Sequence, residues 1–335
     1  MTARYDLPEH AFAPYIRILG RGKKGQADLS FDQAHDAMRM ILNHQVQPEQ
    51  LGAFLMLMRV KEETAEELAG FVAAARASLP PLSRPDLVDL DWPSYAGKRR
   101  HPPWFLLAAL LLAQQGTRIL LHGASGHTAN RLYVEQVLPY FGLAPAHDLA
   151  EAERQLKQQH FSYLPLSCLQ PQLAQLIDLR ALLGLRSPVH SLVRMLNPGH
   201  AKATLLGIFH RNYRDLHQQA AVRLGDARVA IFRGEGGEGE RNPDADCDVF
   251  RVTGSQTEID TWPRLCPQRH TPPATLQPEA LVAVWEGRLH DDYGLQAVLG
   301  STALALATLD PTLTQQAALQ QARQLWSKRS RTATY

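Results

Sequence analysis

The 335-residue sequence is poor in cysteine and contains no long apolar run. Its only cysteines are Cys168, Cys247 and Cys266, and their irregular spacing argues against a disulfide framework or a zinc site. The longest apolar run, residues 104–113, is much shorter than the ~20 residues of a membrane helix. No basic stretch precedes an apolar core near the N-terminus. We therefore expect no signal peptide, no membrane partner and a cytoplasmic location.

An excess of charge of one sign is also missing. The chain has 35 Lys and Arg against 33 Asp and Glu, a net charge of +2, which by itself implies no polyanionic partner. The distribution is less even, because basic residues gather in 98–101 and 186–214 and acidic residues in 235–248. A nearly neutral protein with this pattern can carry a local basic groove.

Common catalytic and metal-binding motifs are missing as well. The 14 histidines show no HExxH spacing, and no GxSxG motif occurs. Asp244, Asp246 and Asp248 resemble a calcium loop, but Val249 and Ser255 stand where that loop requires Gly and Glu. We therefore expect no catalytic residue, no metal site and no cofactor.

Strong helix signals are present in the first 80 residues. Residues 30–33 and 64–67 form capping boxes, and Pro48 suits a first helical position. Apolar residues at helical spacing follow each signal, which predicts three helices ending before 80–81. The apolar face around 54–58 predicts a homodimer through this unit, because so small a bundle exposes apolar surface.

Beyond residue 85, β-type runs alternate with helical patterns. We predict strands at 87–90, 118–122 and 229–233, and helices at 104–115, 130–140, 170–183, 213–224, 294–309 and 311–326. This alternation predicts a mainly parallel sheet with helices on both faces.

The expected fold class is therefore α/β with a small all-α N-terminal domain. Residues 1–80 and helices near 165–190 form the expected helical dimerisation domain, and residues 85–160 and 191–335 form the expected α/β domain.

Residues 30–79 resemble the N-terminal helical domain of anthranilate phosphoribosyltransferase, an enzyme that uses phosphoribosyl pyrophosphate. Weaker similarity extends over most of the chain and is clearest at 184–198 and 228–240. The resemblance implies the fold of the type III phosphoribosyltransferases and nucleoside phosphorylases. It also implies a homodimer.

The catalytic motifs of these enzymes are altered here. Their GTGGDG loop, whose glycines let backbone amides approach pyrophosphate, corresponds to PSYAGK at residues 93–98. Of their KHGNR motif, only His122 and Gly123 remain. Gly239 stands in place of a magnesium-binding aspartate and leaves Glu240 alone. Phosphoribosyl transfer is therefore not expected.

The PSYAGKRRH stretch at residues 93–101 instead resembles the YbiB-type branch of this family, whose members keep the fold and the dimer but bind nucleic acid. The resemblance implies sequence-independent binding of single-stranded DNA or RNA in a basic groove across a homodimer. Tyr95 is expected to stack on a base. The residues expected at the nucleic acid are Tyr95, Lys98, Arg99, Arg100, His101, Arg131, Lys202, Arg211 and Arg214.

The turn after the predicted strand at 118–122 is a second candidate. A helix N-terminus there would favour an anion, although the same residues also suit an ordinary tight turn. The candidate residues are His122, Gly123, Ser125, Gly126 and Thr128. Two other functions stay open: a glycosyltransferase, phosphoribosyltransferase or phosphorylase with an unknown substrate, and a scaffold for a protein partner.

Overall fold

The computed structural model describes residues 8–22 and 24–332. The parts of the predicted domains that fall at 1–7, 23 and 333–335 therefore lie outside the described residues. The N-terminal helices are α1 (Ala13–Gly20), α2 (Phe31–Leu42), α3 (Pro48–Lys61) and α4 (Ala65–Ala77). The capping boxes before α2 and α4 and the proline that begins α3 are as predicted, whereas α1 was not predicted.

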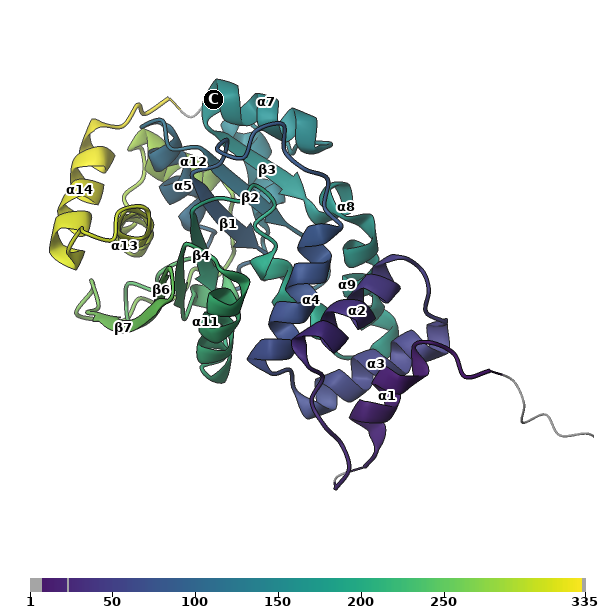
Figure 1. Ribbon diagram of the computed structural model, residues 1–335. Helices are drawn as coiled ribbons and strands as arrows, with labels where there is room; N and C mark the ends of the chain where they lie inside the picture. Colours follow the sequence, from purple (N-terminus) through teal and green to yellow (C-terminus); the bar gives the residue numbers. More distant parts are fainter. Residues whose placement is uncertain (1–7, 23, 333–335) are drawn as a thin grey trace, which may run out of the picture.

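Three later helices join this bundle, as Figure 1 shows for α8 and α9 and as the contacts of α10 with α4 and α9 show for the third. They are α8 (Leu166–Leu169), α9 (Pro171–Leu183) and α10 (Val189–Leu192). The predicted helix at 170–183 corresponds to α9. The structure therefore has the small helical domain that the sequence predicts, assembled from two separate stretches of chain.

A seven-stranded sheet forms the centre of the larger unit. Its order is β3-β2-β1-β4-β5-β6-β7. The strands are β1 (Leu90–Ser94), β2 (Ile119–Gly123), β3 (Phe161–Pro165), β4 (Ala203–Gly207), β5 (Arg228–Phe232), β6 (Cys247–Thr253) and β7 (Gln256–Trp262). β1 to β5 are parallel and β6 and β7 are antiparallel, which confirms the mainly parallel sheet.

The first strand begins later than predicted. Pro93 and Ser94, which the sequence placed in the loop, are the last residues of β1. The pairing of β1 with β4 covers only Leu90 and Asp91. It stops before Pro93, which has no amide hydrogen to donate.

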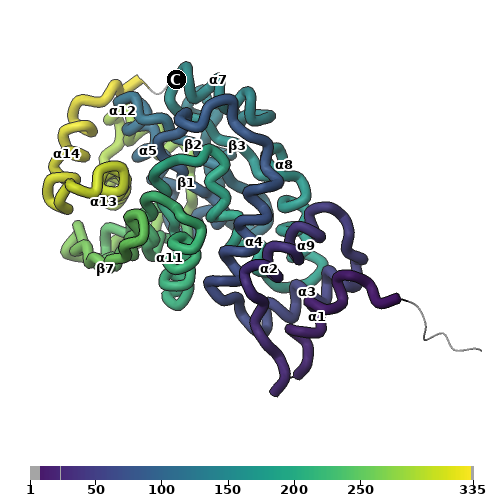
Figure 2. The backbone as a smooth tube through the Cα atoms, in the orientation of Figure 1, coloured from purple at the N-terminus to yellow at the C-terminus, as the bar shows by residue number. Residues whose placement is uncertain are grey.

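Helices cover both faces of the sheet (Figure 2). They are α5 (Phe105–Ala113), α6 (Val134–Val137), α7 (Leu149–Gln159), α11 (Asn212–Leu224), α12 (Glu279–Glu286), α13 (Asp292–Leu309) and α14 (Gln315–Lys328), with short 3-10 turns at Leu138–Phe141, Val193–Met195 and Glu235–Gly237. Of the helix predicted at 130–140, only α6 and the first of these turns form. Among the described residues, no helix combines the length and apolar character needed to span a bilayer.

The sheet separates two hydrophobic cores because successive strand residues point to opposite faces. Ile119 and Leu121 join the core under α5 and α13, whereas Leu120 joins the other. This second core also contains Phe54 and Phe71, so it is continuous with the interior of the helical bundle.

An ion pair reinforces this continuity. Arg76, at the end of α4, makes two hydrogen bonds to the carboxylate of Asp226 after α11, at 2.7 and 3.0 Å. The same guanidinium donates to the Met195 carbonyl oxygen. The bundle and the sheet therefore share both apolar and polar contacts.

Candidate functional site

A cleft of about 520 Å³ opens where β1, β4 and β5 end. The loops after these strands form its walls, together with the segment that follows β7. The end of β7 lies at the same edge because Trp262 pairs with Cys247. Ligands of α/β proteins bind at this edge of the sheet. The cleft is lined by six arginines: Arg100, Arg211, Arg214, Arg233, Arg264 and Arg269.

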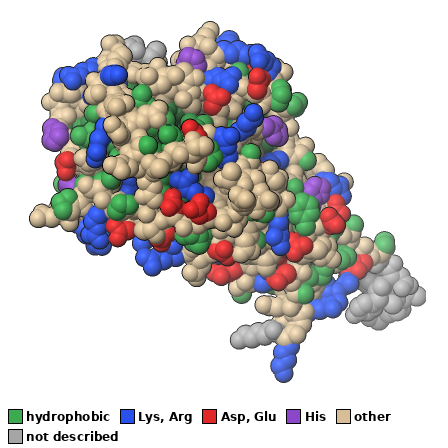
Figure 3. Space-filling view, turned by 60° about the vertical axis from the view of Figure 1, so that its left-hand side comes forward, with side chains coloured by type: hydrophobic (Ala, Val, Ile, Leu, Met, Phe, Trp, Pro, Cys, Tyr) green, Lys and Arg blue, Asp and Glu red, His purple; other side chains and the backbone are tan. Residues whose placement is uncertain are grey.

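Two of these arginines are neutralised by neighbouring acids. Arg214 lies 3.5 Å from a carboxylate oxygen of Asp248, and Arg264 lies 3.5 Å from one of Asp246. Arg214 is also largely buried, with its guanidinium 4.8 Å from the centre of the Phe250 ring. Figure 3 shows basic and acidic side chains interspersed over one face of the molecule.

The other four arginines are not neutralised in this way. The side chains of Arg100, Arg211 and Arg269 are exposed and have no ion pair or hydrogen bond within the described ranges. Arg233 is also exposed, and its guanidinium lies 5.9 Å from the centre of the Phe209 ring. Phe209 itself is 50% exposed. The cleft therefore offers free guanidinium groups beside an accessible aromatic ring.

Two residues expected at the nucleic acid are instead part of the interior. The ammonium of Lys98 is fully buried between the carboxylates of Glu235 and Glu240. Tyr95 is 3% exposed, and its hydroxyl lies 2.7 Å from Nδ1 of His122. In this structure Lys98 is not free to contact phosphate and Tyr95 is not free to stack on a base, contrary to the prediction.

His101 and Arg131 are also constrained by protein contacts. The His101 ring is stacked on Tyr293, with 3.6 Å between centroids. Burial, with Lys98 nearby, lowers the pKa of His101 to about 4, so the ring is uncharged at neutral pH. Arg131 donates to the carbonyl oxygens of Ala96 and Gly97 and braces this loop.

Only part of the predicted set therefore lines the cleft. Arg100, His101, Arg211 and Arg214 do so. Arg99 directly precedes Arg100 and is exposed, but it does not line the cleft. Lys202 is exposed but precedes β4, which places it at the opposite edge of the parallel sheet.

The cleft also contains four residues that were not predicted from the sequence: Phe209, Arg233, Arg264 and Arg269. Arg264 and Arg269 follow the β6–β7 hairpin, which the sequence analysis did not predict. The local basic character of the chain was their only sequence signal.

The backbone after β1 does form an anion site, and a carboxylate of the chain itself fills it. Oε1 of Glu238 accepts hydrogen bonds from the amides of Ala96, at 2.7 Å, and Gly97. Glu240 accepts a hydrogen bond of 2.9 Å from the backbone amide of Phe105, at the start of α5. Two places where the main chain offers donors to an anion are thus already satisfied.

Small residues allow this loop to lie so close to the sheet. A Cβ on Gly239 would overlap Nε1 of Trp92, which donates to the Gly239 carbonyl oxygen at 3.1 Å. A Cβ on Gly234 would overlap the carbonyl oxygen of Glu238. Gly239, for which the family resemblance implied the loss of a magnesium-binding aspartate, therefore has no space for a side chain in this arrangement.

Two carboxylates share one buried ammonium in this loop. Burial raises the pKa of Glu240 to about 7, and adjacent Glu235 adds to the rise while Lys98 opposes it. Burial lowers the pKa of Lys98, but Glu240 and Glu235 outweigh this and raise it overall. Glu240 is therefore the group here that gains a proton near neutral pH, because two acids face a single cation.

The turn at 122–128 does not form the anion site expected at a helix N-terminus. His122 is fully buried, with its Nε2 3.2 Å from Asp91. The next helix, α6, begins only at Val134 and contains four residues. A helix this short has little dipole to attract an anion.

The side chains of this turn have partners of their own. Ser125 donates to Glu135 at 2.6 Å, and Arg180 of α9 donates to Oγ1 of Thr128 at 2.6 Å. A Cβ on Gly123 would overlap the carbonyl oxygen of Ser94. These contacts favour the alternative of a structural turn.

A smaller cavity of about 190 Å³ lies between the helical domain and the sheet. Its Arg186 side chain has no ion pair or hydrogen bond in the described part of the chain. Burial lowers the pKa of His127 to about 4, of His190 to about 3 and of His217 to about 4. Its buried polar atoms without a hydrogen-bond partner are His127 Nδ1, Ser187 Oγ, His190 Nε2, Tyr213 OH and His217 Nε2. The cavity therefore suits a small polar or anionic molecule.

Comparison with known proteins shows which sequences this chain is similar to. The profile of the glycosyl transferase family, helical bundle domain, matches residues 13–79. The uncharacterized protein YbiB of Escherichia coli (strain K12) is 27% identical over 234 residues, which cover 68% of this chain and 72% of that protein. An anthranilate phosphoribosyltransferase of Methylocella silvestris is 28% identical over 301 residues, 87% of this chain and 85% of that protein. The chain is therefore similar to proteins of the anthranilate phosphoribosyltransferase-like family over most of its length.

Solved structures of that family share the fold. Anthranilate phosphoribosyltransferase from Thermus thermophilus superposes with a TM-score of 0.75 at 20% identity, covering 95% of both chains. The Saccharomyces cerevisiae enzyme in complex with PRPP and Mg gives a TM-score of 0.77 at 18% identity, covering 96% of this chain and 94% of that one. The scaffold is thus that of a phosphoribosyltransferase.

Proposed function

We propose that this chain binds the phosphate backbone of single-stranded nucleic acid in the cleft at the carboxyl edge of the sheet. The observation that carries the proposal is the group of three exposed arginines, Arg100, Arg211 and Arg269, which have no protein partner among the described residues and line one cleft. Free guanidinium groups bind phosphate oxygens well, often in pairs of hydrogen bonds. Exposed Phe209 adds a ring on which a base can stack.

The loop after β5 supports binding without phosphoribosyl transfer. Glu238 occupies the amides that would receive pyrophosphate in an active enzyme. Glu240 is committed to Lys98 and Phe105, and Gly239 leaves no second acid beside it. Mg²⁺ requires several oxygen ligands in octahedral geometry, and this loop does not supply them.

A transferase with an unknown substrate is the second candidate. The cavity beside Arg186 favours it, because unsatisfied buried polar atoms there suit a small ligand. Turnover of phosphoribosyl pyrophosphate or a nucleoside with Mg²⁺ would support this alternative. Nucleic-acid binding in the absence of turnover supports the first candidate.

The test is a titration of labelled single- and double-stranded oligonucleotides at 50 and 200 mM salt. Each phosphate neutralised on a single strand contributes about −0.7 to the log–log salt slope. Replacing Arg100, Arg211 and Arg269 by alanine should therefore flatten the slope by about 2. The affinity of wild-type protein should fall about 20-fold more than that of the variant across this range. All sequences should be affected alike.

The matched control removes three cations elsewhere. Arg21, Arg323 and Lys328 are exposed and do not line the cleft, so their combined replacement by alanine changes the net charge equally. This control should retain most of the affinity and the salt slope. Equal weakening by both triple substitutions, or no binding by the wild type at 50 mM salt, contradicts the proposal.

We also propose that the helical domain forms a homodimer. The apolar face predicted for this contact is unsuitable, because Phe54, Leu55 and Met58 are buried within the bundle. Val60 of α3 and Leu182 of α9 are each 81% exposed and are better candidates. Exposed apolar side chains on a small bundle favour association.

A further inference from the structure

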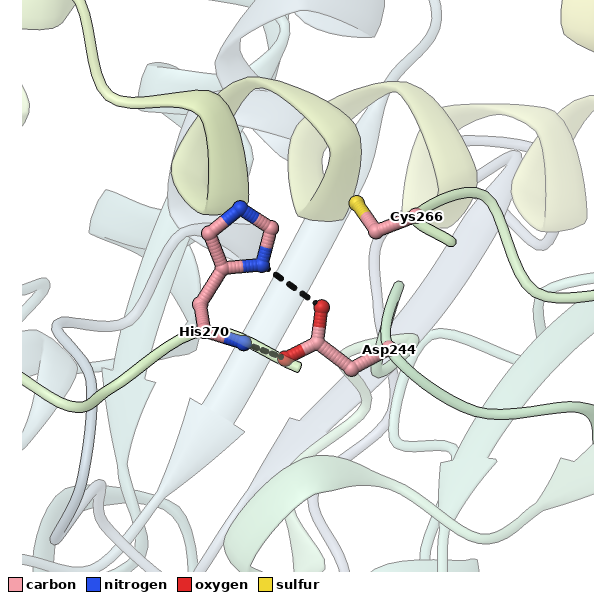
Figure 4. Close-up of side chains that lie close together, drawn as sticks. All are labelled: Asp244, Cys266 and His270. Carbon is pink, nitrogen blue, oxygen red and sulfur yellow. Dashed lines mark hydrogen bonds and ion pairs between the residues drawn. The ribbon is translucent and has the colours of Figure 1, made fainter. Parts of the chain in front are cut away.

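Three residues of different types converge in the wall of the cleft (Figure 4). Asp244 follows β5, and Cys266 and His270 follow β7. One carboxylate oxygen, the sulfur and one imidazole nitrogen all lie within 4.8 Å of one another. Asp244 is 8% exposed and Cys266 is 3% exposed, so two of the three side chains are held inside the protein. We propose that Asp244, Cys266 and His270 bind one divalent ion of the zinc type.

The chemistry of the three donors selects the class of metal. A thiolate, an imidazole and a carboxylate together suit zinc and neighbouring transition metals. Mg²⁺ and Ca²⁺ prefer oxygen ligands, so a sulfur donor disfavours them. Both Asp244 and His270 line the cleft, which leaves a further coordination position for water or another oxygen ligand.

The spacing of the donors requires little movement to accept the ion. Oδ1 of Asp244 lies 2.8 Å from Nδ1 of His270. In a tetrahedral site with bonds of about 2.0 Å, two such atoms are about 3.3 Å apart. A rotation of the imidazole opens this distance, and the sulfur, within 4.8 Å of both atoms, completes the set of three donors.

Neighbouring groups already hold the ligands in orientation. Nε2 of His270 lies 3.2 Å from a carboxylate oxygen of Asp292, at the start of α13. A carboxylate on the second ring nitrogen is the usual support of a metal-binding histidine and leaves Nδ1 for the ion. Oδ2 of Asp244 accepts the backbone amide of His270 at 2.8 Å, which fixes the carboxylate.

Binding of the ion exchanges protons for metal. Without metal, His270 is an imidazolium that keeps its Nε2 proton toward Asp292 throughout. The ion displaces two other protons: the Nδ1 proton, which lies toward Asp244, and the thiol proton of Cys266. When the ion binds, the nitrogen lone pair and the thiolate form bonds to it, and both protons pass to solvent. The two charges of the ion are then balanced by the thiolate and the carboxylate.

The alternative without a metal is a simple ionic clamp. A protonated His270 would then connect Asp244 and Asp292, and Cys266 would only fill space. The two alternatives differ in whether sulfur becomes a ligand. Cobalt distinguishes them, because a thiolate bonded to Co²⁺ gives a charge-transfer band in the near ultraviolet.

The experiment titrates Co²⁺ into full-length protein freed of metal by a chelator. We expect one Co²⁺ per chain, a thiolate band, and loss of that band when one equivalent of Zn²⁺ is added. Cys266→Ser should abolish the band. Cys168→Ser, which changes an exposed cysteine outside the cluster, should retain it.

A substitution outside the ligands keeps the test independent of folding defects. Asp292 is more than half exposed, and Asp292→Asn should preserve the band while weakening Co²⁺ affinity about 10- to 100-fold. Far-ultraviolet circular dichroism checks that each variant is folded. The proposal is overturned if wild-type protein gives no thiolate band, if folded Cys266→Ser keeps it, or if Asp292→Asn binds Co²⁺ as tightly as wild type.

Discussion

Replacing Glu238 by alanine tests whether its carboxylate really completes the loop after β1. In the wild type the carboxylate of this buried side chain accepts hydrogen bonds from the backbone amides of Ala96 and Gly97. Its removal leaves two N–H groups without an acceptor, and each unsatisfied buried donor costs about 1–3 kcal/mol. The free energy of unfolding, measured by urea denaturation, should therefore fall by at least about 2 kcal/mol.

The vacated amides should then accept an anion from solution. Inorganic pyrophosphate at 100 times its Kd would restore about 2.7 kcal/mol to Glu238→Ala. The wild type should gain much less, because its own carboxylate fills the position. Glu238→Gln keeps an acceptor oxygen, so it should lose less stability than Glu238→Ala and should be stabilised less by pyrophosphate. Equal protection of wild type and Glu238→Ala by pyrophosphate, or a stability loss below about 0.5 kcal/mol, would refute this account of the loop.

Three further predictions concern the core, the buried acid and the dimer. Gly70→Ala should lower the free energy of unfolding by about 1–3 kcal/mol, because its Cβ would overlap α2. Gly52→Ala, which has open space around the new Cβ, should raise the free energy of unfolding by up to about 1 kcal/mol in the same urea assay. A change of the same sign in both variants would contradict the packing argument. The pKa of Glu240, raised by burial from 4.5 to about 7, means that the folded state binds an extra proton between these values. The resulting stability, up to about 3 kcal/mol, is fully present below pH 4.5 and is lost as pH rises through 7. Glu240→Gln should flatten this dependence between pH 5 and 8, and an unchanged profile would exclude Glu240 as its source. Val60→Glu combined with Leu182→Glu should convert a dimer to monomers in sedimentation experiments, whereas a monomeric wild type or an intact variant dimer would argue against the proposed interface.

Features encoded by neighbouring residues were predictable from the sequence. The capping boxes at 30–33 and 64–67 specify where α2 and α4 begin, because each uses side chains three positions apart. Four strands were missed: β3, β4, β6 and β7. Of these, β3 and β4 have only five residues each, mostly or fully buried, and therefore lack the alternation that marks a half-exposed strand.

The site was harder to predict because it depends on contacts between distant segments. Lys98 looks like a free cation in the sequence, yet its two acids follow more than a hundred residues later. Arg100 lies two residues further along and has no ion pair or hydrogen bond of its side chain among the described residues. Cys266 and His270 are four residues apart, but this spacing was not identified as a signal in the sequence. Asp244 joins them only because β6 and β7 form a hairpin. Charge clusters therefore indicated the right region without identifying the free side chains.

The core shared between the helical bundle and the sheet affects how the protein is made on the ribosome. Arg76 meets its partner Asp226 only after 150 further residues have been synthesised. At about 5–20 residues per second, that interval is roughly 8–30 s. At the start of this interval α4 has been made, but α10 and α11, which pack against it, have not. Helix α4 is therefore synthesised well before it can acquire its complete set of native contacts.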